Sequence, residues 1–158
     1  MSSESSFPEE LASAAELTSA SKFHYRPTWV PQAGHRSHGT GIAIDVVRIP
    51  GDRGAQVSEE LIAAAKGNAG PILVRVASSG QDVLFIVPPG TAESFHWPPG
   101  VFAHGVQWRE YVAVPALRGW VTVPVRWESH PTAVQQYVDP DALFKLVCRL
   151  TDWPGGPP

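Results

Sequence analysis

The chain has 158 residues, of which 43% are hydrophobic and 17% charged, so it is long enough for one domain with a buried core and too apolar for a globally disordered protein. Its formal net charge of −3 excludes a general nucleic-acid coat protein, because neutralising phosphates requires a surplus of Lys and Arg. The single cysteine, Cys148, excludes an internal disulfide and a cysteine-based zinc cluster.

The segment MSSESSFPEE at the start of the chain is polar and acidic and does not have the pattern of a secretory signal. No apolar run approaches the length of a membrane-spanning helix. We therefore expect a cytoplasmic protein that has no membrane partner.

The N-terminal quarter predicts one helix and one irregular segment. Residues 1–7 are expected to be a disordered lead, and Pro8 with the acids after it opens a helix. Residues 24–40 have no hydrophobic period and contain prolines and glycines, which is typical of irregular structure. Within this segment, Trp29 and Val30 are expected to dock inward.

The next part of the chain predicts a buried strand followed by a helix. IAIDVVRI at 42–49 is β-branched and apolar on both faces except at Asp45, which indicates a central strand that is covered on both sides. A turn is expected over 50–54. Residues 55–66 have apolar side chains at helical spacing, and Gly67 is suited to end that helix.

Several strands then follow closely in sequence. PILVRV at 71–76 and DVLFIVP at 82–88 are joined by ASSGQ and predict a hairpin. VFAHGV at 101–106 indicates a short strand or a turn, and further strands are expected at 110–115 and 120–127.

The chain closes with a predicted helix over 138–150, with Asp139 as its cap and Pro140 at its first position, before a flexible tail at 151–158. Clustered strands after one crossover indicate an α+β fold. We expect a single domain over 8–150, with a mixed, largely antiparallel sheet of five to six strands packed against about three helices.

Common catalytic patterns are absent from the sequence. There is no Gly-x-Ser-x-Gly elbow and no Walker loop. His35 and His38 lie three residues apart, but two imidazoles alone make a weak metal site, so we expect them to be solvated or hydrogen-bonded. PPGT at 88–91 either supplies backbone donors for a phosphate or forms a proline-stiffened turn.

Arginines and aromatic residues recur at predicted strand ends and in loops. Arginine forks bind phosphates and stack on rings, and aromatic faces stack on bases. The candidates for phosphate binding are Arg48, Arg75, Arg109 and Arg126, and those for base stacking are Trp108 and Tyr111.

The order of segments resembles a short actinobacterial version of the bifunctional DNA primase/polymerase N-terminal family. The segments that carry this resemblance are IDVVRIPGDRGAQV, GPILVRV, VLFIVPPGTA, REYVAVPA and DALFKLVCRL. The resemblance runs from about Glu10 to Leu150 and implies the archaeo-eukaryotic primase-like fold. It also implies a site in which two acids on one strand, a later histidine and a third acid hold divalent cations for nucleotidyl transfer.

This sequence departs from that pattern. Asp45 is present, but Val47 stands at the position of the second acid and Arg48 follows it, while VLFIVP has no histidine and the third position has only Glu110. We therefore expect a non-catalytic domain without metal or cofactor, which binds a nucleotide or nucleic-acid segment in an accessory role. Asp45 is expected to orient Arg48.

Two alternatives stay open. In the first, Asp45, Asp82 and Glu110 converge on Mg²⁺ and support a weak nucleotidyltransferase. In the second, the domain is a protein-interaction or self-association module whose exposed rings form an apolar patch. The rings expected in that patch are Phe95, Trp97, Phe102 and Trp120.

Overall fold

The computed structural model describes residues 25–119 and 123–154. The lead, the helix expected from Pro8, the ring of Trp120 and the last four residues of the tail lie outside the described residues. The described elements are β1 (His35–Gly39), β2 (Asp45–Pro50), α2 (Gly51–Ala65), β3 (Ile72–Ala77), β4 (Gly80–Val87), the 3-10 turn η1 (Ala92–Ser94), β5 (Phe102–His104), β6 (Tyr111–Pro115), β7 (Val125–Ser129) and α3 (Pro140–Thr151).

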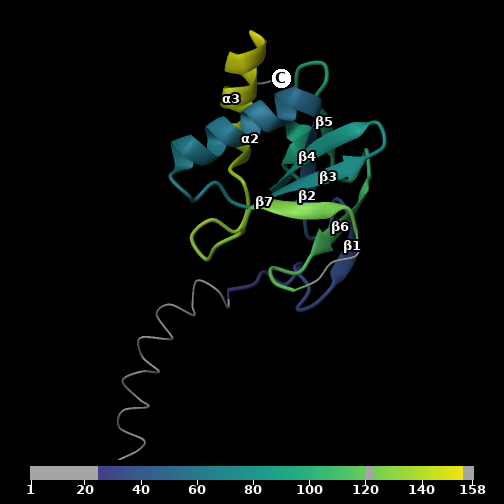
Figure 1. The fold of residues 1–158 in the computed structure, drawn as a ribbon. Helices are drawn as coiled ribbons and strands as arrows, with labels where there is room; N and C mark the ends of the chain where they lie inside the picture. Colours follow the sequence, from purple (N-terminus) through teal and green to yellow (C-terminus); the bar gives the residue numbers. More distant parts are fainter. Residues whose placement is uncertain (1–24, 120–122, 155–158) are drawn as a thin grey trace, which may run out of the picture.

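The strands form two sheets, one of five strands in the order β5-β2-β4-β3-β7 and one of two strands, β1 and β6. Figure 1 shows α2 and α3 on one side of the larger sheet and the β1–β6 pair on the other. The α+β class is therefore confirmed. Every strand pair in the described residues is antiparallel, so the larger sheet is not mixed.

The two faces of the larger sheet bury two separate hydrophobic clusters, because successive side chains of a strand point to opposite faces. On β2, Val47 and Ile49 face the helices and belong to the cluster that contains Leu61 and Leu143. Val46 faces the smaller sheet, in the cluster that contains Trp29, Val30 and Val112. The central strand covered on both sides and the inward docking of Trp29 and Val30 are thus confirmed.

The helix α2 begins at Gly51, so the turn expected over 50–54 is in fact the first turn of the helix. A Cβ on Gly54 would collide with the carbonyl oxygen of Ile49, which explains why a glycine allows the helix to start so close to β2. The helix ends at Ala65, and its C-cap Lys66, whose φ of 51° is left-handed, is followed by Gly67. Sequence patterns marked the apolar stripe of this helix but not its first turn.

The closing helix has the predicted cap. The Asp139 carboxylate accepts hydrogen bonds from the backbone N–H groups of Asp141 and Ala142, and Pro140 occupies the first turn. The prediction missed β1, because its sequence HRSHG is polar and lacks the β-branched residues that mark a strand. No described helix has the length and apolar character needed to cross a bilayer.

Candidate functional site

Asp45, the first residue of β2, is buried on the helix-facing side of the sheet with 1% of its surface exposed. Its Oδ2 accepts hydrogen bonds from the backbone N–H groups of Gly90 at 3.0 Å and Ala92 at 3.1 Å. Its Oδ1 has no hydrogen-bond partner. Gly90 of the PPGT turn and Ala92 just after that turn therefore bind a carboxylate of the chain itself.

Burial raises the pKa of Asp45, because desolvation disfavours its charged form. The hydrogen bonds from Ala92 and Gly90 oppose this rise, and the nearby charge of Glu93 adds to it. A buried acid of this kind contributes less negative charge to the site than an exposed carboxylate would.

Arg48 lies three residues beyond Asp45 on β2 and faces the opposite side of the sheet, towards the β1–β6 layer. The expectation that Asp45 orients Arg48 was wrong, because an odd separation on a strand places two side chains on opposite faces. Arg48 instead donates from Nε to Nε2 of His104 at 3.2 Å, and its guanidinium carbon lies 4.4 Å from the ring centre of Phe102.

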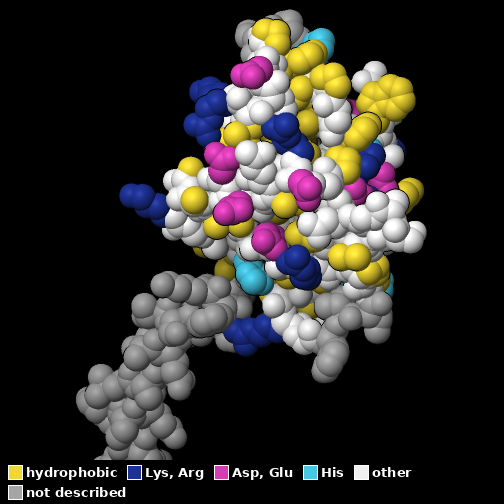
Figure 2. Space-filling view, turned by 45° about the horizontal axis from the view of Figure 1, so that its top comes forward, with side chains coloured by type: hydrophobic (Ala, Val, Ile, Leu, Met, Phe, Trp, Pro, Cys, Tyr) yellow, Lys and Arg dark blue, Asp and Glu magenta, His cyan; other side chains and the backbone are white. Residues whose placement is uncertain are grey.

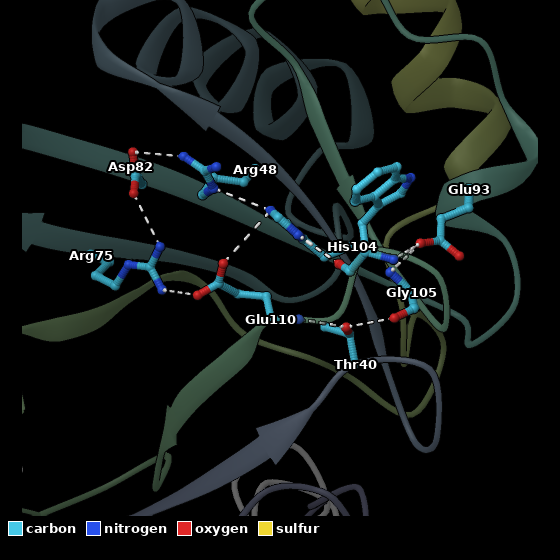
Figure 3. A network of polar contacts seen from close by, with 9 residues as sticks. Thr40, Arg48, Arg75, Asp82, Glu93, His104, Gly105 and Glu110 are labelled. Atoms are coloured by element: carbon cyan, nitrogen blue, oxygen red, sulfur yellow. Dashed lines mark hydrogen bonds and ion pairs between the residues drawn. The ribbon is translucent and has the colours of Figure 1, made fainter.

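Five polar side chains close a ring on this second face (Figure 3). Asp82 lies 3.1 Å from Arg75 and 3.9 Å from Arg48, and Arg75 also lies 3.8 Å from Glu110. The ring closes through His104, 3.9 Å from Glu110. Two arginines and two carboxylates offset each other here, so this network has no net charge beyond that of the histidine.

The hydrogen bonds of His104 fix its tautomer. Nε2 accepts from Arg48, so it carries no proton, and Nδ1 must therefore be the N–H donor that meets the backbone oxygen of Trp108 at 2.9 Å. His104 is thus neutral in this arrangement and connects the charged ring to the loop that carries Trp108.

The β5–β6 loop is held at both ends by one buried hydroxyl. Thr40 Oγ1 donates to the backbone oxygen of Gly105 at 2.9 Å and accepts from the backbone N–H of Glu110 at 3.0 Å. A backbone hydrogen bond from Thr40 N–H to the Glu110 oxygen adds to this closure. The two ends of the loop are therefore fixed relative to each other (Figure 3).

Glu93 fixes the interior of the same loop. Its Oε2 accepts from the N–H groups of Gly105 at 3.1 Å and Trp108 at 2.6 Å, and its Oε1 accepts from Gln107 at 3.0 Å. Burial alone would raise the pKa of Glu93, but these backbone donors and that of Val106 outweigh it and lower the pKa. Glu93 is therefore an anion at neutral pH.

Gly105 packs closely against both carboxylates. A Cβ at this position would lie 2.7 Å from Oε1 of Glu93 and 2.9 Å from Oδ2 of Asp45, closer than real Cβ atoms come to other heavy atoms. Only glycine fits here without a shift of one of the two acids.

The loop displays its side chains to solvent around an open cleft of about 370 Å³. Trp108 is 69% exposed and Phe102 is 43% exposed. The residues that line the cleft are Glu93, Phe95, Val101, Phe102, Ala103, His104, Gln107 and Trp108.

Other exposed apolar side chains flank the loop. Val106 is exposed, and Gly41 packs against its backbone, which brings the turn that carries the exposed Ile42 next to the loop. Tyr111 is also exposed and covers Gly39 of β1 without lining the cleft. Figure 2 shows hydrophobic side chains gathered at the upper right of that view, beside charged ones.

The predicted site residues separate into two groups. Arg48, Arg75, Asp82 and Glu110 meet in the charged ring, and Trp108 adjoins it through His104. Arg126 lies on the helix-facing side of β7, where it pairs with Glu128 at 2.5 Å. Arg109 is exposed and does not line the cleft.

The apolar patch expected from the sequence is not present as predicted. Phe95 and Trp97 pack against Phe144 of α3, with ring centres 5.0 and 5.2 Å from that ring. Of the expected rings that the structure describes, Phe102 is the exposed one. Among the described residues, the exposed rings instead come from β5, the β5–β6 loop and the start of β6.

Sequence reasoning missed Thr40, Glu93, Gly105 and His104 as site residues. The signal available was indirect: a buried Asp45 requires donors, and the glycine-containing turn at 88–91 could supply them. Nothing in the local pattern indicated that the Glu93 carboxylate would accept hydrogen bonds from the backbone of a loop twelve to fifteen residues away.

No protein-family model, curated protein or solved structure matches this chain.

Proposed function

We propose that this chain is a non-catalytic, primase-polymerase-like domain that acts by binding, with the β5–β6 loop as its recognition surface for a protein partner. The argument has two parts: the candidate acids do not converge, and the loop is held in one conformation while its side chains stay exposed.

The three candidate acids lie on two sides of the sheet. Asp45 is buried on the helix-facing side, whereas Asp82 and Glu110 are on the other side and both contact Arg75. In the described ranges 25–119 and 123–154, no group of three or more His, Cys, Asp or Glu side chains could hold a metal ion. Two-metal nucleotidyl transfer requires converging carboxylates. Asp45, Asp82 and Glu110 therefore do not fit the magnesium site that a weak nucleotidyltransferase would need.

The observation that carries the binding proposal is the pre-organised loop. Thr40 closes its ends, Glu93 binds its N–H groups and His104 binds the Trp108 oxygen. Binding to a loop that is already ordered loses little conformational entropy, and exposed tryptophan is the residue type that most often dominates protein interfaces. A loop with Trp108 at its surface is therefore suited to bind a partner.

The charges favour a protein partner over a nucleic acid. Of the four arginines expected to bind phosphate, Arg48 and Arg75 are already paired with acids on the face near the loop. Arg126 is paired on the opposite face. Nucleic-acid binding depends on uncompensated positive charge, and the cleft itself contains Glu93.

A peptide library tests this proposal. Random linear peptides are selected on the wild-type protein and then measured against Trp108→Ala and against Val134→Ala, a control that removes an exposed apolar side chain from the segment between β7 and α3. We expect peptides that Val134→Ala still binds and Trp108→Ala does not. Light scattering on the same variants identifies self-association; a dimer that Trp108→Ala dissociates would make a second copy the partner.

A second candidate function is binding of a nucleotide or single-stranded nucleic acid. It is favoured by the Arg48 guanidinium over the ring of Phe102 and by the exposed Arg109 next to Trp108. Fluorescence anisotropy with labelled single strands and nucleotides tests it. Two results together would favour this second function over a protein partner. The strands or nucleotides would bind in a salt-sensitive way that Trp108→Ala abolishes, and no selected peptide would depend on Trp108.

A further inference from the structure

We propose that the cleft beside β5 receives a basic side chain, the guanidinium of an arginine or the ammonium of a lysine, that the protein partner presents. This inference rests on the proposed function and names the chemistry that the partner brings to the loop.

The cleft combines aromatic faces with one negative charge. Phe95, Phe102 and Trp108 contribute rings to its lining, and Glu93 is the lining residue that carries a fixed charge. Arginine and lysine side chains have an apolar stem and a cationic end, so their stem contacts rings while the charge meets a carboxylate. The composition of the lining matches that combination.

Glu93 presents a fixed negative charge to a cation. Its Oε2 accepts hydrogen bonds from Gly105 and Trp108, its Oε1 accepts one from Gln107, and the backbone N–H of Val106 also lowers its pKa. The same backbone donors hold the carboxylate in position, so a guanidinium or ammonium group would meet a fixed oxygen rather than a mobile one.

The positive groups of β2 and β5 that adjoin the cleft are compensated, and Arg109, next to Trp108, is exposed and does not line the cleft. Arg48 contacts Asp82, and His104 is neutral because its Nε2 accepts from Arg48. Asp45 Oδ2, like Glu93 Oε1, lies close to the position that a Cβ on Gly105 would take, and any charge that Asp45 carries is also negative. Among the residues that line the cleft, Glu93 is therefore the charge that an incoming group meets.

Phe102 shows that a ring at this place binds a cation. The Arg48 guanidinium carbon lies 4.4 Å from the centre of the Phe102 ring, within the range of cation–π contact. Trp108 is more exposed than Phe102, and indole is the aromatic ring that binds cations most strongly. A second cation could stack on Trp108 beside the existing pair.

The peptides selected for the proposed function also test this inference. We expect the peptides that depend on Trp108 to share an arginine or lysine. Replacing that residue by citrulline or acetyl-lysine keeps its length and removes its charge, and we expect affinity to fall about tenfold for the wild-type protein. This comparison leaves the protein unchanged, so protein stability does not affect it.

The matched protein variant is Glu93→Gln, with Glu128→Gln as the control because Glu128 is a carboxylate on β7, at the opposite edge of the sheet from β5. In Glu93→Gln, arginine and citrulline peptides should bind within about twofold of each other, while Glu128→Gln should keep the wild-type preference. Thermal unfolding confirms that each variant is folded. Peptides that depend on Trp108 but bind equally with or without the charge would overturn this inference and leave the proposed function intact. If no selected peptide depends on Trp108, the proposed function itself fails.

Discussion

Asp45 and Arg48 lie three residues apart on β2 and point to opposite faces of the five-stranded sheet. One face gives a buried acid bound by the backbone of a turn, and the other gives an arginine within a neutral ionic ring. A short stretch of strand thus supplies two unrelated polar sites. Both sites hold the same loop, through Glu93 on one side and His104 on the other.

The first prediction concerns Gly105, which packs closely against both carboxylates. Gly105→Ala should lower the free energy of unfolding by about 2 kcal/mol, because the added methyl group must displace Glu93 or Asp45. Chemical denaturation measures this change. Gly39→Ala is the control, since its Cβ would lie 3.3 Å from the exposed Tyr111 ring, which can move. Equal stability of both variants would contradict the packing around Gly105.

The second prediction concerns the hydroxyl that closes the loop. Thr40→Val keeps the shape of the side chain but removes the donor to Gly105 and the acceptor for Glu110, so we expect a loss of about 2 kcal/mol. Amide hydrogen exchange should accelerate in residues 105–110. Thr28→Val, at an exposed position, should change neither quantity. Unchanged exchange in Thr40→Val would show that the hydroxyl does not hold the loop.

The third prediction concerns the pH dependence that Asp45 contributes. Its pKa is raised in the folded state, so the folded protein holds this proton more tightly than the unfolded chain does. The free energy of unfolding of the wild type, relative to Asp45→Asn, should therefore fall as the pH rises above about 4. Urea unfolding at a series of pH values measures this difference. If this difference in the free energy of unfolding instead rose with pH, the folded protein would stabilise the charged form of Asp45, which would contradict the prediction.

The fourth prediction concerns Glu93, whose pKa is shifted in the opposite direction. Because its folded pKa is lowered, its contribution to stability is present above about pH 4.3 and is lost as the pH falls through the folded pKa. The wild type relative to Glu93→Gln should therefore gain stability as the pH rises in the acid range and then level off. The same urea series gives both slopes, and two slopes of equal sign would contradict the described environments of these neighbouring acids.

Much of the fold was predictable because its signals are local. The apolar run of β2, the β3–β4 hairpin and the Asp139 cap of α3 each depend on residues adjacent in sequence, and each was confirmed. β1 was missed because its residues are polar and its pairing with β6 spans more than seventy residues. Such a pairing leaves no periodic signal in the strand itself.

The candidate site was predictable in part. Arg48, Arg75, Asp82 and Glu110 were identified one by one, and the register of β2, β3 and β4 brings the first three together. Arg126 was expected with them, but the register of β7 places it beside Val74 on the helix-facing side. A one-residue change in register reverses the face of every side chain, so the grouping of these arginines could not be read from their spacing.

The sequence by itself determined the α+β class, the residues that occupy the core and the absence of the paired acids that the resembled family uses on one strand, because composition, periodicity and residue identity are properties of the chain alone. Only the tertiary structure decided which polar groups meet. Glu93 reaches the N–H groups of a loop on another segment, and Thr40 closes a loop that begins 65 residues later. Contacts of this kind depend on strand order and register, which are set by how two hydrophobic clusters pack on one sheet rather than by any local pattern.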